Sequence, residues 1–243
     1  MESFTFETIG SLRLCVSREH RFGTDAFLLA GFSRVRRGDR ACDLCAGCGI
    51  IPLLWLRDEP RPAVVYAVEL LEQPIAQMEL TVRENGLENR LVPIHRDLRE
   101  LAGEITPGSI DLVACNPPYF RPGTGAPAQT SHRLAARHEV SCDLPAIAET
   151  AARLLRYGGR FCFCGRPQRL ADAMEALRDT GLEPKRLRLV QKHADTPPWL
   201  FLLEGRKGGR PSLRVEPPLL MENPGGGFTR EVLEIYGKKE GPP

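Results

Sequence analysis

Features that would mark a membrane, secreted or strongly charged protein are missing from this 243-residue chain. It has no run of about 18 apolar residues, so we expect no membrane span. Residues 1–10 form neither a basic nor an apolar segment, so we expect no secretory signal and a cytoplasmic protein. The net charge is only +2, so any surface for a nucleic acid must be a local patch.

Two binding motifs are incomplete. Cys42, Cys45 and Cys48 have the C-x2-C-x2-C spacing of an iron–sulfur ligand run, but Pro52 stands where the fourth cysteine would be. We therefore expect no metal, and reduced structural thiols for the eight cysteines. The turn at residues 43–49 lacks the G-x-G-x-x-G spacing of a dinucleotide-binding fold, which argues against a dehydrogenase.

What is present is the composition and pattern of an α/β protein. Hydrophobic residues make up 42% and charged residues 26%, as in an ordinary globule with a full core. We expect a single domain over residues 1–243, with a hairpin extension in residues 1–20 that turns at Gly10 and a flexible substrate loop at 120–139. Apolar runs alternate with helical patterns, which predicts a doubly wound, mostly parallel sheet with helices on both faces. The seven predicted strands are 41–44, 63–68, 91–95, 110–115, 160–164, 183–192 and 199–203.

Asn116-Pro117-Pro118-Tyr119 follows the strand predicted at 110–115 and is the most informative motif. In an open α/β sheet, the carboxyl ends of the strands border the crevice where ligands bind. Two prolines fix the backbone, so the side-chain carbonyl of Asn116 and the backbone carbonyl of Pro117 can converge on one amino group. Tyr119 offers a flat face. The motif predicts methyl transfer to a planar exocyclic nitrogen; the alternative is an ordinary turn after a core strand.

Acidic residues stand at the ends of three successive predicted strands. Asp43 begins a glycine-containing turn, Glu69 ends the next strand, and Asp97 ends the third, where it is placed to accept from an adenine amino group. Glycines in such a turn let the backbone approach a nucleotide-like ligand, and the acid about 20 positions later commonly binds ribose hydroxyls. This arrangement suits a cationic, ribose-bearing ligand such as S-adenosylmethionine, with solvated surface acids as the alternative.

Taken together, these segments resemble the class I S-adenosylmethionine methyltransferases of the amino-group type. More narrowly, they resemble the bacterial tRNA1(Val) adenine-37-N6 methyltransferase family. The likeness runs nearly end to end and includes residues 22–26, the turn at Asp43, 116–120, 136–139 and the tail at 228–237. It implies a Rossmann-like class I fold, S-adenosylmethionine as cofactor, and methylation of N6 of an adenine in tRNA, at adenine-37 beside the anticodon of a valine tRNA.

The resemblance also implies three sets of site residues and a partner. The catalytic set is Asn116, Pro117 and Tyr119. The cofactor set is Phe22, Gly23, Thr24, Asp25, Asp43, Cys45, Ala46, Gly47, Gly49, Glu69, Asp97, Leu98 and Asn116. The substrate set is Tyr119, Phe120, Arg133, Arg137, His138, Arg206 and Lys207. For each basic residue the alternative is a solvated surface charge. We expect the anticodon loop of a tRNA as partner, no membrane, and a monomer or weak dimer.

The sequence also predicts how one helix begins and which backbone conformation Cys45 adopts. Gly23 permits a tight turn, and the side chain of Thr24 or Asp25 is expected to cap the helix that begins at Ala26. The family usually has Gly where this chain has Cys45. We expect an extended conformation there, because a positive φ would strain a cysteine, and unchanged cofactor chemistry.

Other functions share the Asn-Pro-Pro-Tyr motif. Protein-glutamine N5 methyltransferases normally carry a helical domain before the nucleotide turn, whereas 42 residues precede Asp43 in this sequence, so we do not expect that function. A ribosomal guanine-N2 methyltransferase stays open, as does a non-catalytic RNA-binding protein on the same fold. Product analysis separates the first from an adenine enzyme, and cofactor turnover separates the second.

Overall fold

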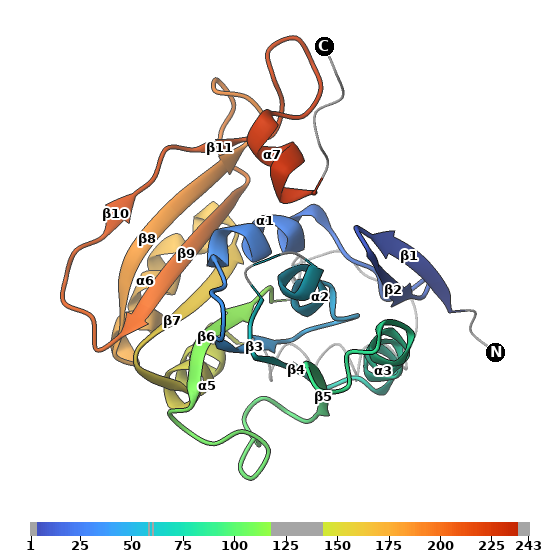
Figure 1. Cartoon of the computed structure of the whole chain (residues 1–243). Coiled ribbons are helices and arrows are strands. Elements are labelled where there is room, and N and C mark those ends of the chain that lie inside the picture. Colours follow the sequence, from blue (N-terminus) through green and yellow to red (C-terminus); the bar gives the residue numbers. More distant parts are fainter. Residues whose placement is uncertain (1–3, 58, 60, 118–142, 238–243) are drawn as a thin grey trace, which may run out of the picture.

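The computed structural model describes residues 4–57, 59, 61–117 and 143–237. It begins with an antiparallel hairpin of β1 (Thr5–Ile9) and β2 (Leu12–Val16) (Figure 1). Gly10 occupies the tight turn with a φ of 64°, a left-handed conformation that glycine adopts without strain. The predicted N-terminal hairpin is confirmed, whereas the loop predicted at 120–139 lies outside the described residues.

A nine-stranded sheet follows, in the order β10-β8-β9-β7-β6-β3-β4-β5, with β11 paired to β8. Only β9 runs antiparallel to its neighbours among the described strands of this sheet; the other pairings are parallel. The mostly parallel sheet and its seven predicted strands are therefore confirmed. These strands are β3 (Arg40–Leu44), β4 (Val64–Glu69), β5 (Leu91–His95), β6 (Ile110–Cys115), β7 (Leu155–Gly165), β8 (Leu182–Gln191) and β9 (Leu200–Lys207).

The structure differs from the sequence pattern in two places. Two short strands, β10 (Arg214–Val215) and β11 (Leu219–Leu220), lengthen the sheet beyond seven strands. The strand predicted at 160–164 is longer than expected, because the preceding helix ends at Leu154 and β7 begins directly at Leu155, which pairs with Ile110. The register shifts there and Gly158 has a φ of 77°, so β7 starts irregularly.

Helices cover both faces of the sheet (Figure 1). One face is covered by α1 (Thr24–Ser33), α2 (Ile50–Arg57), α3 (Glu72–Asn85) and the short α7 (Arg230–Ile235). The other is covered by α5 (Leu144–Leu154) and α6 (Leu170–Asp179), with a 3-10 turn at Pro167–Arg169. None of the described helices is long and apolar enough to cross a bilayer.

Alternation along the strands divides the interior into two cores. On β7, Cys162 and Cys164 belong to the core on the α1 side, whereas Phe161 and Phe163 belong to the core on the α5 side. This period of two is the expected pattern for a strand buried on both faces. A residue's position in the strand therefore decides which layer its side chain contacts.

The strand register gathers three polar side chains at one edge. Asp43 pairs with Ala67 on β4 and with Ala114 on β6. Glu69 and Asn116 each lie two positions beyond those partners, so their side chains point to the same face as Asp43. This edge, where the parallel strands end, is called the carboxyl edge below; the opposite edge is the amino edge.

Candidate active site

The carboxyl edge contains a buried acid. Asp43, near the end of β3, is 1% exposed, and among the described residues neither of its carboxylate oxygens has a hydrogen-bond partner. Burial, and after it the charge of Glu69, raises the pKa of Asp43 well above its ordinary value. A buried polar group without a partner destabilises the folded state. This arrangement favours a side chain kept for a cationic ligand.

The turn after Asp43 brings the backbone close to open space. The φ angles of Gly47 and Gly49 are 54° and 84°. A Cβ built on Gly47 meets nothing within 4 Å, whereas one on Gly49 would lie 2.7 Å from Cγ of Met78 on α3. Gly47 therefore leaves room for a ligand, and Gly49 lets α3 pack tightly against the turn.

The extended conformation predicted for Cys45 is wrong. Cys45 has a φ of 59°, in the left-handed region. Directly after it, the Ala46 N–H donates to the Val68 carbonyl on β4 at 3.0 Å. A non-glycine residue in this conformation costs about 1 kcal/mol, and such strain often occurs where a backbone serves a ligand.

Glu69 borders the same turn from β4. One carboxylate oxygen, Oε2, accepts from the Gly47 N–H at 2.9 Å. The other, Oε1, accepts from the N–H groups of Leu70 and Leu71 at 2.8 and 3.0 Å. Because all three donors belong to the backbone, the carboxylate is held in one position, and its remaining lone pairs are available to hydroxyl donors.

Asn116 and Pro117 follow β6 directly, and both are partly buried. The Cys164 thiol, near the end of β7, donates to Oδ1 of Asn116 over 3.0 Å. No motif in the sequence pointed to Cys164. Only the strand register could have found it, because Cys115 pairs with Phe163 and the next residues on the two strands are therefore adjacent.

Asp97 lies on the loop after β5, where it binds a neighbouring arginine. Its carboxylate accepts from Nε and Nη2 of Arg99 at 3.0 and 2.6 Å. The side-chain hydrogen bond from Arg99 lowers the pKa of Asp97. Leu98 is buried beside it, and its carbonyl accepts from the hydroxyl of Thr150 on α5 at 3.2 Å. A contact between Asp97 and a ligand remains a prediction, and such a ligand would share the carboxylate with Arg99.

The C-terminal end of α1 lies toward the amino edge: the Ser33 carbonyl accepts from Arg160 at 2.6 Å, and Arg160 lies near the start of the pairing between β6 and β7. The N-terminal end of α1 therefore points to the carboxyl edge. The predicted side-chain cap is wrong. The N-cap residue is Gly23, in an extended conformation and without a side-chain cap hydrogen bond, so Thr24 is already helical. Its hydroxyl instead accepts from the Tyr236 hydroxyl at 3.2 Å.

An aromatic stack ties the C-terminal tail to this end of α1. The ring of Tyr236 stacks on Phe27 with 4.6 Å between centroids and on Phe228 with 5.6 Å. Phe22 packs against Phe27 at 5.7 Å. The tail is therefore in a position to hold residues 22–25, a role that its resemblance to the family did not reveal.

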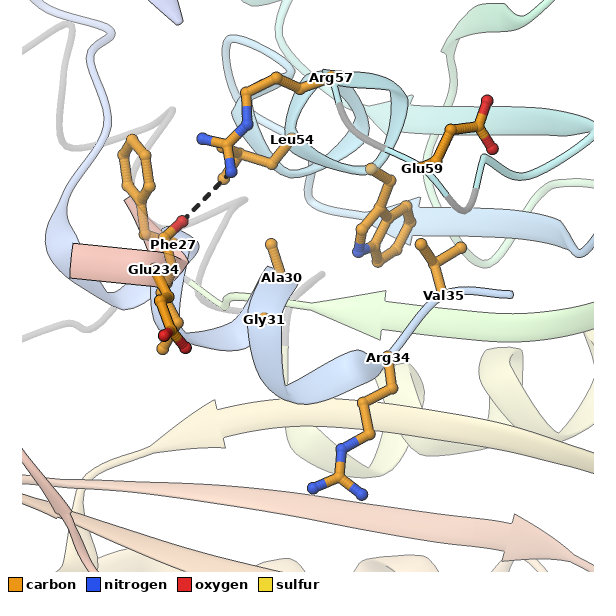
Figure 2. A pocket seen from close by; sticks show the side chains of 11 residues that line it. Phe27, Ala30, Gly31, Arg34, Val35, Leu54, Arg57, Glu59 and Glu234 are labelled. Carbon is orange, nitrogen blue, oxygen red and sulfur yellow. Dashed lines mark hydrogen bonds between the residues drawn. The ribbon is translucent and has the colours of Figure 1, made fainter. Parts of the chain in front are cut away.

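A cavity of about 230 Å³ lies between α1, α2 and α7 (Figure 2). Arg57 on α2 donates to the carbonyls of Ile235 and Tyr236, both at 3.3 Å. None of the acids at the carboxyl edge lines this cavity. We therefore attribute it to the packing of the tail and not to the site.

The structure does not bring all the predicted substrate residues together. Arg206 and Lys207 end β9, which is antiparallel to β7, so they lie at the amino edge. They donate to the carbonyls of Gly158 and Leu155 at 3.1 and 2.7 Å, and we leave them out of the proposed substrate site. The remaining predicted residues lie outside the described part of the chain: Tyr119, Phe120, Arg133, Arg137 and His138.

The spaced cysteines do not converge. Cys42 belongs to the core on the α5 side and Cys48 to the core on the α1 side. Burial raises the pKa of the Cys48 thiol to about 12. Within the described ranges, no three His, Cys, Asp or Glu side chains form a group that could hold a metal ion.

The family model of the methyltransferase small domain matches residues 22–179, from the segment before α1 to the end of α6. The chain belongs to this family. A tRNA1(Val) (adenine(37)-N6)-methyltransferase of Serratia proteamaculans is 30% identical to this methyltransferase over 185 residues, 75% of this chain and 69% of the relative. One of Tolumonas auensis is 28% identical over 217 residues, 88% of this chain and 87% of the relative. The predicted family resemblance is confirmed.

A solved structure described as a predicted O-methyltransferase of Agrobacterium tumefaciens has the same fold. The TM-score is 0.69 at 21% identity, over 88% of this chain and 95% of the other. The predicted class I methyltransferase fold is confirmed, and this methyltransferase depends on S-adenosylmethionine. The carboxyl edge fits that cofactor through the carboxyl group of Asp43, which has no hydrogen-bond partner in the described part of the chain, and through the open space at Gly47.

Proposed function

We propose that this methyltransferase transfers a methyl group to the exocyclic N6 of an adenine in tRNA, at adenine-37 beside the anticodon of a valine tRNA. The observation that carries the proposal is the position of Asn116, with Pro117 next to it, at the same edge and face of the sheet as Asp43 and Glu69; the face is that of Asn116. The relatives from Serratia and Tolumonas, which are named for this reaction, support the choice of substrate.

Each polar group of the carboxyl edge would contact a different part of the cofactor. Bound S-adenosylmethionine supplies a methyl group already activated on a sulfonium. Asp43 would face the cationic methionine part, and Glu69 would accept from the ribose hydroxyls. The loop at Asp97 and Leu98 would hold the adenine ring. Residues 22–25, fixed by the tail, would cover the ligand from the end of α1.

Asn116 and Pro117 prepare the nitrogen that accepts the methyl group. The lone pair of an adenine amino group is delocalised into the ring and is therefore a poor nucleophile. When Oδ1 of Asn116 and the carbonyl of Pro117 accept its two N–H groups, the nitrogen is fixed and its lone pair is directed out of the ring plane. Alignment supplies most of the acceleration. The nitrogen then loses one of these protons to solvent.

The tRNA is proposed to present the adenine as a flipped-out loop base. Sequence-selective proteins commonly read unpaired loop bases and stack them on aromatic rings, and a base must leave its stack before its edge is modified. Tyr119 and Phe120 would stack on the base, and Arg133, Arg137 and His138 would contact phosphates. A monomer or weak dimer remains part of the proposal, and a tRNA substrate supports a cytoplasmic protein.

The test is incubation with methyl-labelled S-adenosylmethionine and unmodified total tRNA, followed by nucleoside digestion and mass spectrometry. We expect labelled N6-methyladenosine. Labelled N2-methylguanosine, or label found only in protein, would show that the shared motif transfers methyl groups to another acceptor. No turnover of the cofactor with any tRNA would leave an RNA-binding protein on this fold.

A further inference from the structure

Beside the proposed catalytic amide, β7 carries a buried thiol. Cys164 is 0% exposed, and its Sγ lies 3.0 Å from Oδ1 of Asn116. Because the pairing of Cys115 with Phe163 places the next two residues of the strands side by side, the contact is a consequence of strand register. Both side chains point to the α1 face, where Asp43 also lies.

A side-chain amide has two different ends, and the proposed chemistry needs one of them. The oxygen accepts hydrogen bonds and the NH2 group donates them, so an amide turned the wrong way would present a donor to the adenine amino group. The thiol donates to Oδ1 and so fixes the oxygen at this end. Oδ1 has two lone pairs, and the second remains for the substrate N–H.

The weakness of the thiol as a donor suits this task. A charged donor would form a strong hydrogen bond with Oδ1 and reduce its capacity to accept from the adenine. A thiol orients the oxygen without neutralising it. We propose that Cys164 is a positioning residue for methyl transfer, which holds the amide of Asn116 with its oxygen toward the acceptor nitrogen. This inference rests on the function proposed above.

Cys162 provides a matched control on the same strand. It is also fully buried, it lies two positions earlier on the same face of β7, and its thiol is 3.8 Å from Oε2 of Glu204. Removing either thiol creates a similar small cavity. Of these two thiols, that of Cys164 contacts Asn116 and that of Cys162 contacts Glu204, so an effect on catalysis that is specific to Cys164 separates positioning from packing.

The experiment compares Cys164→Ala, Cys164→Ser and Cys162→Ala with the wild-type protein in steady-state methylation of unmodified tRNA. Because Cys164→Ala removes one weak hydrogen bond to the amide, we expect it to lower kcat about tenfold and to leave the KM for S-adenosylmethionine unchanged. The hydroxyl of Cys164→Ser replaces the donor and is expected to keep kcat within about threefold of wild type. Cys162→Ala is expected to keep the wild-type kcat.

Two results would overturn the positioning role. In one, Cys164→Ala keeps the wild-type kcat. In the other, Cys164→Ser is as slow as Cys164→Ala, because size and not donation would then matter. Failure of the proposed substrate looks different: wild-type protein would label a product other than N6-methyladenosine. The ratios of kcat among the variants, measured on that product, would still decide the role of the thiol.

Discussion

Asp43 and Glu204 are two buried acids in one row of the sheet, with opposite surroundings. Asp43 pairs with Ala114, which pairs with Cys162, which pairs with Glu204. Three strand spacings separate the two acids by roughly 14 Å. Glu204 accepts from Nη1 of Arg186 at 2.6 Å, whereas Asp43 has no hydrogen-bond partner among the described residues.

The network around Glu204 also holds the C-terminal end of α1. Arg160 donates to the Ser33 carbonyl at 2.6 Å and lies 3.3 Å from Asp39. Arg186 pairs with Glu216 at 3.0 Å as well as with Glu204. Buried charges are tolerated when each has a partner, and a buried carboxyl group without one favours a partner supplied by a ligand. The half of this face around Glu204, called the closed half, therefore contributes to stability. The half around Asp43, called the open half, is available to a ligand.

The largest effect is expected at the open half, from Asn116→Ala. Without the amide oxygen, the acceptor nitrogen is not aligned, so kcat should fall by about 10³-fold or more. Binding of S-adenosylmethionine and the midpoint of urea unfolding should stay close to wild type. Methyl-transfer kinetics and calorimetric titration check this, and retained turnover would contradict the mechanism.

At the closed half, Glu204→Gln should remove stability and not function. Arg160 and Arg186 would lose a negative partner in a buried site, so the free energy of unfolding should drop by about 3 kcal/mol. The affinity for S-adenosylmethionine, measured below the unfolding transition, should not change. Urea denaturation measures the free energy of unfolding. Weaker binding of S-adenosylmethionine by this variant would contradict the separation of a stabilising half from a ligand-binding half.

Asp43→Asn is the matched change at the open half, and its effects should have the opposite pattern. Losing a charge-assisted contact should weaken S-adenosylmethionine binding about 10- to 100-fold. Because the amide stays neutral without binding a proton, the change should raise the free energy of unfolding of the ligand-free protein at neutral pH by about 1 kcal/mol. An unchanged dissociation constant in calorimetric titration would refute the assignment of Asp43 to the cofactor.

Cys45→Gly tests the strain in the turn. Glycine adopts a φ of 59° without steric cost, so this change should stabilise the ligand-free protein by about 1 kcal/mol. The glycine backbone in the unfolded chain offsets part of this gain. Thermal unfolding with and without S-adenosylmethionine measures the effect. A lower unfolding temperature would mean that contacts of the thiol outweigh the strain.

The two halves should also respond to pH in opposite directions. Burial raises the pKa of Asp43 above its ordinary 3.8, so as pH rises from that value the folded protein holds a proton that the unfolded chain has lost, and stability declines. Burial alone would raise the pKa of Glu216, but hydrogen bonds from Arg186 and Arg214 lower it from 4.5 to about 2. Its contribution is present above pH 4.5 and is lost as pH falls toward 2.

Urea unfolding of the ligand-free protein at several pH values checks these signs. The stability advantage of Asp43→Asn over wild type should grow as pH rises. The deficit of Glu216→Gln should shrink in acid, where the wild-type carboxylate also becomes protonated. A deficit that stays constant down to pH 2 would mean that Glu216 acts through packing and not through charge.

The strand ends could be predicted from the sequence because apolar periodicity is a local signal. Asp43, Glu69 and Asn116 follow apolar runs, and a parallel sheet brings such ends to one edge. The position of Arg206 could not be predicted in this way. It depends on the reversal of β9 within the sheet, which carries the residue to the amino edge.

Other features depend on contacts between segments that lie far apart in the chain. The thiol of Cys164 reaches Asn116 through strand register, and Tyr236 reaches Thr24 across 212 positions. Neither contact can be predicted from composition or from the periodicity of apolar residues. Cys45 adopts its left-handed conformation in the turn between β3 and α2, whereas the steric preference of a single residue predicts an extended one.

The most direct test of the central claim uses two unmodified transcripts of a valine tRNA, one with adenine and one with guanine at position 37. Each is incubated with wild-type protein and methyl-labelled S-adenosylmethionine, then digested and analysed by mass spectrometry. The proposed function predicts labelled N6-methyladenosine from the first transcript and no label in the second. Equal labelling of both transcripts, or label on guanine N2, would contradict it.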